Sequence, residues 1–126
     1  MGLLDGLLGN ASEINAEEIR TKYSMLLVSG EKINQAYKVV RDMFLFTDRR
    51  LILVDVQGLT GKKVEYHSIP YDKITHFSIE SAGNFDMEAE LKIWISGMGP
   101  NPIEKTFGRN DSVYKIQSLL AEYVMR

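Results

Sequence analysis

From Glu31 onward, apolar residues recur at every second position, which is the period of a β-strand with one buried face. Seven short segments of this kind are separated by turn-forming residues such as Asp48-Arg49 and the glycines at 58 and 61. The predicted strands span residues 32–40, 43–47, 50–56, 62–69, 73–80, 87–95 and 102–107. Parallel neighbours need crossover connections of a dozen residues or more, so these short gaps predict antiparallel pairing.

Apolar spacing changes to a helical period at both ends of the chain. Near the start, four leucines share one face of a short predicted helix: Leu3, Leu4, Leu7 and Leu8. A second predicted helix begins at Asn15, where Glu18 completes a capping box, and stops near Ser29-Gly30. We therefore expect the first thirty residues to be helical. A third amphipathic helix is predicted over residues 110–126.

This order of elements predicts a mainly β fold. Seven meandering strands form two bent antiparallel sheets or a strongly bent barrel, and one C-terminal helix covers the open end. The chain has 126 residues, which fits a single domain. We expect residues 1–30 to be a helical segment packed on that domain, and residues 31–126 to form the barrel with its helix.

Composition and charge exclude several classes of function. The net charge is −2, which provides no general attraction to nucleic acid or to an anionic membrane. The chain has no cysteine, which excludes disulfides, thiol nucleophiles and thiolate metal sites and is typical of a reducing compartment. We predict a cytoplasmic protein without a nucleic-acid partner.

Two basic corners are the candidate contacts for an anion or a partner. Arg49 and Arg50 precede one apolar run, and Lys62 and Lys63 follow it in the stretch GLTGKK. A P-loop needs four residues between its glycines, then Lys and Ser or Thr, and it opens a helix, whereas this stretch is shorter and precedes a strand. Consecutive corners of a meander point to opposite ends of a sheet. The two basic pairs are therefore not expected to converge on one ligand.

The side chains do not combine into a recognisable catalytic or metal-binding set. His67 and His76 lie on predicted strands and come within reach of each other if those strands pair, but no third ligand stands at metal spacing. Nucleophile-elbow, dinucleotide-binding and kinase motifs are missing from the sequence. We predict no catalytic residue, no cofactor and no metal.

Trp94 is the strongest candidate for an interface. Within residues 87–95, the apolar set Ala89, Leu91, Ile93 and Ile95 faces the interior, so strand alternation places Trp94 outside among charges. Interfaces are enriched in tryptophan. Either a neighbouring subunit or the N-terminal helices of the same chain would cover this ring. The four leucines near the start are expected to pack on the barrel or on a neighbouring subunit.

The run TDRRLILVDVQGLTGKKVEYHSIPY, with MGLLDGLLGNASEI before it and AELKIWISG and IEKTF after it, resembles the bacterial pleckstrin-homology (PH) domain family, formerly a domain of unknown function. The resemblance implies a PH-like fold of seven strands capped by a C-terminal helix. It also implies a cyclic homo-oligomer, with a pentamer as the first guess, and a hydrophilic surface for protein partners where neighbouring strands meet. Related families suggest a link to envelope stress. The resemblance implies no reaction and supplies no catalytic residues.

These patterns lead to two hypotheses of different class. The first is a non-catalytic module that assembles into a cyclic homo-oligomer and binds an unidentified protein partner. The alternative is peripheral binding to an anionic lipid or membrane surface through Arg49, Arg50, Lys62 and Lys63, which the net charge disfavours.

Overall fold

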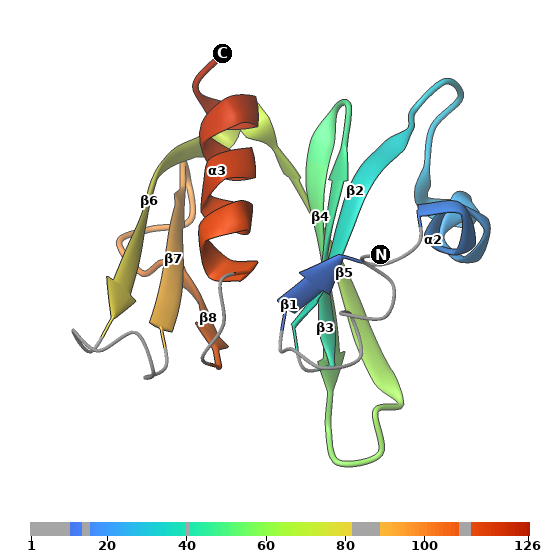
Figure 1. Ribbon diagram of the computed structural model, residues 1–126, viewed down its shortest axis with the longest axis horizontal. Coiled ribbons are helices and arrows are strands. Elements are labelled where there is room, and N and C mark those ends of the chain that lie inside the picture. The colour runs from blue at the N-terminus through green and yellow to red at the C-terminus, as the bar shows by residue number, and fades with distance from the viewer. Residues whose placement is uncertain (1–10, 14–15, 40, 82–88, 109–111) are drawn as a thin grey trace.

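The computed structural model describes residues 11–13, 16–39, 41–81, 89–108 and 112–126. Eight strands form two antiparallel sheets, ordered β1-β2-β3-β4-β5 and β6-β7-β8 (Figure 1). Their bounds are β1 Ala11–Glu13, β2 Ile33–Val39, β3 Asp42–Thr47, β4 Arg50–Gln57, β5 Lys63–Pro70, β6 Ile74–Ser81, β7 Ala89–Ile95 and β8 Ile103–Phe107. The helices are α2 Ala16–Lys22 and α3 Ser112–Val124, with 3-10 turns η1 Ser24–Leu26 and η2 Tyr71–Lys73. All seven predicted strands and the C-terminal helix are confirmed within the described residues, and positions 40, 87–88 and 110–111 of those predictions lie outside them.

The prediction that the first thirty residues are only helical is wrong at β1. Ala11–Glu13 pairs with the outer edge of β2, with Ala11 opposite Val39 and Glu13 opposite Tyr37. Three residues are too few to show a period of two, and alanine and glutamate do not favour strands. The open edge of β2 supplies the hydrogen-bonding partners that make this segment a strand. The helix predicted over Leu3, Leu4, Leu7 and Leu8 lies outside the described residues.

The second predicted helix is shorter than expected but buries the predicted face. α2 ends at Lys22, and the chain then tightens into η1, where Leu26 N donates to Tyr23 O at 3.0 Å. Ile19 and Tyr23 are buried, and Leu26 and Leu27 pack beside them. They cover Ile33, Ala36, Met43, Leu45, Ile52 and Val54 on one face of the five-stranded sheet. The predicted cap at Asn15 lies outside the described residues.

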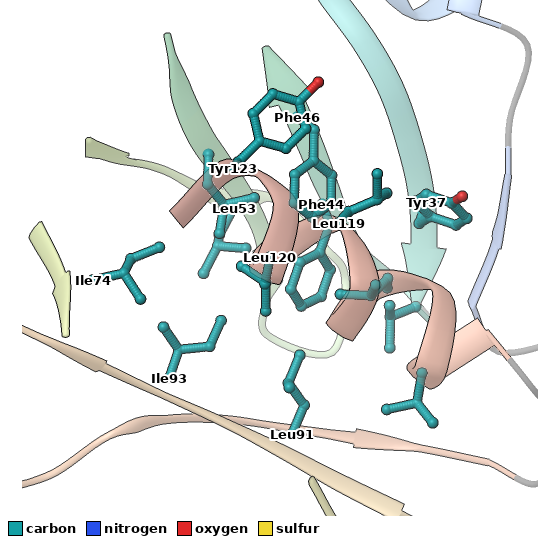
Figure 2. Packing of buried hydrophobic residues seen from close by; sticks show 14 of the residues in the cluster. Tyr37, Phe44, Phe46, Leu53, Ile74, Leu91, Ile93, Leu119, Leu120 and Tyr123 are labelled. Carbon is teal, nitrogen blue, oxygen red and sulfur yellow. The ribbon is translucent and has the colours of Figure 1, made fainter. Parts of the chain in front are cut away.

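The main core lies between the two sheets, on the other face of the five-stranded sheet. Figure 2 shows Leu120 of α3 between the two sheets, near Phe44 and Leu53 on one side and Leu91 and Ile93 on the other. β3 is therefore buried on both faces, with Phe44 and Phe46 facing the main core and Met43 and Leu45 facing α2. Because both faces are buried, the sequences of the central strands are continuous apolar runs.

Aromatic stacking holds the C-terminal end of α3 against the sheet. The Tyr123 ring stacks between Tyr71, with ring centroids 4.7 Å apart, and Phe46, at 5.8 Å. Asn34 Nδ2 donates to the Tyr123 hydroxyl at 3.0 Å, and the Tyr71 hydroxyl donates to Thr47 O at 2.6 Å. Burial raises the pKa of the Tyr71 hydroxyl far above its ordinary value, so this donor keeps its proton throughout the physiological range.

An ion pair connects the sheets at the other end of the core. Lys105 points inward from β8, and its Nζ lies 3.0 Å from Asp42 Oδ2 and 3.8 Å from Asp55 Oδ1. Asp42 Oδ1 also accepts a hydrogen bond from Val56 N at 2.9 Å. A lysine on the inner face of a strand is thus neutralised by two carboxylates of the opposite sheet.

Candidate functional site

The first basic corner, between β3 and β4, divides its two arginines between different roles. Thr47 organises the turn, since its Oγ1 accepts hydrogen bonds from Arg49 N at 3.0 Å and Arg50 N at 2.9 Å. The Arg49 side chain is exposed, whereas Arg50 reaches back under the turn to Glu31. Only Arg49 of this pair is available to a partner.

Glu31 anchors Arg50 in a buried network. Arg50 Nε donates to Glu31 Oε2 and Nη2 to Oε1, both at 2.9 Å, and the Glu31 side chain is 1% exposed. Thr47 Oγ1 donates to Oε2 at 2.7 Å and Val28 N to Oε1 at 3.0 Å. These hydrogen bonds, that of Arg50 foremost, lower the pKa of Glu31 from 4.5 to about 2.

Arg50 makes two further hydrogen bonds. Its Nη1 donates to Ser68 Oγ at 2.9 Å, and its Nη2 donates to Leu26 O. The hydrogen bond to Glu31 raises the pKa of the guanidinium further above its ordinary value. Arg50 therefore connects η1, β4 and β5 as a structural group. Sequence reasoning missed Glu31, because nothing near it along the chain indicates a partner nineteen residues away.

The second basic corner is an extended hairpin loop between β4 and β5. Gly58 and Gly61 have positive φ, at 80° and 70°, as the turn requires. Arg41 buttresses the loop, since its Nη1 donates to Gly58 O at 2.7 Å and its Nη2 to Val56 O at 3.1 Å. Lys62 and Lys63 are exposed.

The two basic corners lie at opposite ends of β4. Arg50 is opposite Pro70 at one end, and Gln57 is opposite Lys63 at the other. Seven residues of extended strand separate them by about 23 Å. The structure therefore does not bring the arginine pair and the lysine pair together.

The two histidines are also kept apart by the fold. His67 pairs across from Leu53 in the five-stranded sheet, and His76 pairs across from Trp94 in the three-stranded sheet. Among the described residues, histidine and carboxylate side chains do not gather into a group that could hold a metal ion.

Trp94 lies on the outer face of the three-stranded sheet, as its strand alternation predicts. Its ring stacks on His76 with centroids 4.4 Å apart and planes 15° apart, and its Nε1 donates to Pro100 O at 3.1 Å. The described N-terminal helix α2 packs on β2 in the other sheet. Trp94 is therefore half-buried by His76 of the neighbouring strand β6 and by the loop after β7, and not by α2. The leucine candidates at 3, 4, 7 and 8 lie outside the described residues.

The outer edge of β5 is a further exposed feature. β5 pairs only with β4, so eight residues present an edge that no described strand covers. Val64 and Tyr66 on this strand are 37% and 41% exposed. Tyr23 meets Tyr66 edge-on at 6.3 Å, so η1 lies close by and adds Met25, which is 68% exposed. We call Val64, Tyr66 and Met25 with this strand edge the β5 edge surface.

Of the helices in the described part of the chain, none combines the length and the apolar character that a membrane crossing requires.

Comparison with known proteins agrees with this architecture. "Uncharacterized protein YjqA" of Bacillus subtilis is 51% identical over 125 residues, which cover 99% of this chain and 100% of that protein. A crystal structure of a pleckstrin homology domain from Shewanella amazonensis is 52% identical, with a TM-score of 0.83 and 98% of each chain covered. A DUF1696 family protein with a pleckstrin-homology domain from Shewanella loihica is 49% identical, with a TM-score of 0.78, covering 92% of this chain and 98% of that one. The family model of the bacterial PH domain matches residues 2–124, and the chain therefore belongs to the bacterial PH domain family.

Proposed function

We propose that this protein is a non-catalytic, cytoplasmic PH-like module that assembles into a cyclic homo-oligomer, a pentamer in the first instance, and recognises a protein partner. The observation that carries the proposal is the β5 edge surface. A long uncovered strand edge beside exposed apolar side chains favours association with another chain. The charges of Lys63 and Glu65 on the strand restrict binding to partners with complementary charges.

A ring requires two different surfaces on each subunit. Subunits related by a cyclic axis higher than twofold meet head to tail, so each interface joins one patch to another patch. The stacked pair Trp94 and His76 is the second candidate patch, because it lies in the other sheet and presents a large aromatic, and Met98 in the loop after β7 is also exposed. We expect the β5 edge surface of one subunit to pack on the Trp94 side of the next.

Partner recognition is assigned to the polar end of the same outer face, where Glu80 is opposite Glu90, away from the Trp94–His76 pair. Lys92 Nζ lies 3.2 Å from Glu80 Oε1 and 3.8 Å from Glu90 Oε1, and Glu104 is opposite Lys92 on β8. One lysine among three carboxylates leaves this face acidic. Such a face attracts a partner with a basic patch.

Light scattering tests self-assembly directly. We expect a mass several times the 14.3 kDa of one chain at tens of micromolar, and a smaller species for Trp94→Glu and for Tyr66→Glu. Tyr114→Glu is the matched control, because Tyr114 is 55% exposed on α3 and away from both patches. Circular dichroism establishes that each variant keeps its fold. A wild-type monomer would end the proposal, as would an unchanged mass in both interface variants.

A second candidate function, peripheral binding to an anionic membrane, is favoured by one observation. Leu59 at the tip of the β4–β5 loop is fully exposed, and Lys62 and Lys63 follow it closely. Each lysine near an anionic surface contributes about 1 kcal/mol, and one inserted leucine about 2 kcal/mol. The total corresponds to about millimolar affinity. This is too weak for a single tip to hold the protein on a membrane.

Sedimentation with anionic vesicles distinguishes the two functions. We expect the wild type to stay in the supernatant at physiological salt. Salt-sensitive sedimentation that is lost in Leu59→Ser and in Lys62→Glu/Lys63→Glu, but retained in the control Lys73→Glu, would replace the protein-binding function with the membrane-binding one.

A further inference from the structure

An open groove of about 460 Å³ runs between β2 and α3, on the opposite edge of the five-stranded sheet from β5. Its volume is within the range of ligand-binding sites. Two residues of β2 and five of α3 line it: Gln35, Tyr37, Tyr114, Lys115, Ser118, Leu119 and Glu122.

The groove has an apolar middle and opposite charges at its two ends. Tyr37 and Leu119 are buried in its floor, and Tyr114 is a 55% exposed aromatic at its rim. Lys115 and Glu122 are exposed, and within the described residues neither has an ion-pair partner. They are seven residues apart on α3, which places them about 10 Å apart along the helix axis.

The direction of β2 relative to α3 determines which lining residues lie together at each end of the groove. The hydrogen bond from Asn34 to Tyr123 places the start of β2 beside the end of α3, so Gln35 lies at the Glu122 end and Tyr37 toward the Lys115 end. The strand and the helix thus run antiparallel along the groove. Successive side chains of an extended chain point to opposite faces, so two side chains that both face α3 are an even number of positions apart, and four positions are enough to span about ten ångströms.

Main-chain groups of β2 lie along the same groove. β1 pairs with residues 37–39 of β2 only, so no described strand covers the edge at residues 33–36. A side chain does reach part of it, since Arg20 Nε donates to Ile33 O at 3.3 Å. Strand edges beside a groove bind extended peptides, with the backbone contributing affinity and the side-chain sites specificity.

We propose that this groove binds an extended peptide segment of a partner protein, with an acidic and a basic residue four positions apart and an apolar residue midway between them. The acidic side chain lies at Lys115, the basic one at Glu122, and an apolar side chain on Tyr37 and Leu119. The proposal rests on the proposed function only in that the protein recognises a protein partner, and the groove is a second contact surface, separate from the acidic outer face of the three-stranded sheet. It is independent of self-assembly, because the groove and the β5 edge surface lie on opposite edges of the sheet.

Three fluorescein-labelled octapeptides test this charge pattern by fluorescence anisotropy on the full chain. The mixed probe is GSEVLVKG, the diacidic probe is GSEVLVEG and the dibasic probe is GSKVLVKG. The wild type is expected to bind the mixed probe about fivefold more tightly than the other two, since each exposed charge pair contributes up to about a fivefold effect.

Charge reversals in the groove should move this preference in a defined way. Lys115→Glu should favour the dibasic probe and Glu122→Lys the diacidic probe, by about fivefold each. Both changes place favourable charges near the ends of α3, so the fold should be retained. Ser118→Trp should fill the groove and abolish binding of all three probes. Asp72→Lys/Lys73→Glu, an exposed charge swap on η2, is the matched control and should behave as wild type.

Absence of binding by any probe at about 1 mM would overturn the proposal. The proposal would also be overturned if the wild type and both charge-reversal variants ranked the three probes in the same order. Light scattering on the same variants distinguishes peptide binding from self-assembly. Peptide binding can be lost while the protein stays multimeric, and a monomeric protein can still bind the peptide.

Discussion

The Glu31 carboxylate is almost completely buried, and yet it remains charged. Burial alone would raise its pKa, but the fork of Arg50 and the hydroxyl of Thr47 stabilise the ionised form more strongly. In the sequence, Arg49 and Arg50 look equivalent. Only the position of Glu31 beneath the turn makes Arg50 a structural residue and leaves Arg49 as a surface one.

This environment predicts an acid-dependent loss of stability. The pKa of Glu31 is lowered on folding, so its contribution is fully present above 4.5 and is lost as the pH falls from 4.5 to about 2. The shift corresponds to about 3 kcal/mol. Glu31→Gln should therefore lower the free energy of unfolding by about 2 to 3 kcal/mol at pH 7, and the gap to wild type should close near pH 2.

Urea denaturation at several pH values measures this gap. Glu65→Gln, an exposed carboxylate on β5, is the control and should change the free energy of unfolding little at any pH. A constant difference between wild type and Glu31→Gln from pH 7 to pH 2 would show that the carboxylate does not act through its charge.

At the scale of elements, local sequence decided the strands and their turns, and contacts decided the rest. The β4–β5 hairpin is a local structure, since two glycines provide its positive φ angles. β1 has no such local basis, and it is a strand because β2 offers it an edge. α2 ends before Tyr23 although the apolar spacing continues, because η1 places Leu26 and Leu27 on the same sheet face by a tighter route.

The two hairpin glycines give a matched pair for experiment. Both need positive φ, so replacement by alanine should cost about 1 kcal/mol at either position. A Cβ on Gly61 would also lie 3.3 Å from Val56 Cγ1, whereas one on Gly58 would meet no atom within 4 Å. Gly61→Ala should therefore lower the free energy of unfolding by about 1 kcal/mol more than Gly58→Ala. Equal losses in urea denaturation would contradict the contact.

At the scale of the whole molecule, two sheets and α3 enclose the main core, and few polar contacts cross it. Lys105 is one of these contacts, because it joins β8 to Asp42 and Asp55 of the opposite sheet. Its side chain is only 16% exposed. Replacing it leaves two carboxylates close together without their cation, which is more costly than losing an exposed pair.

Lys105→Met should lower the free energy of unfolding by about 1 to 3 kcal/mol. Lys92→Met is the matched control, since Lys92 also meets two carboxylates but on the outer face, where Glu80 is 69% exposed. Its loss should be clearly smaller, because solvent screens these exposed pairs. Thermal unfolding of both variants at equal protein concentration makes the comparison, and a larger loss for Lys92→Met would refute it.

The sequence by itself determined the strand segments from Glu31 onward, the amphipathic C-terminal helix and the outward position of Trp94. These depend on alternation and on turn residues, which act within a few positions of the chain. Tertiary structure alone decided that Glu31 neutralises Arg50, that Ala11–Glu13 is a strand and that His76 covers Trp94. Each of these depends on residues brought together from distant parts of the chain. A partner's position in space leaves no periodic trace in the sequence.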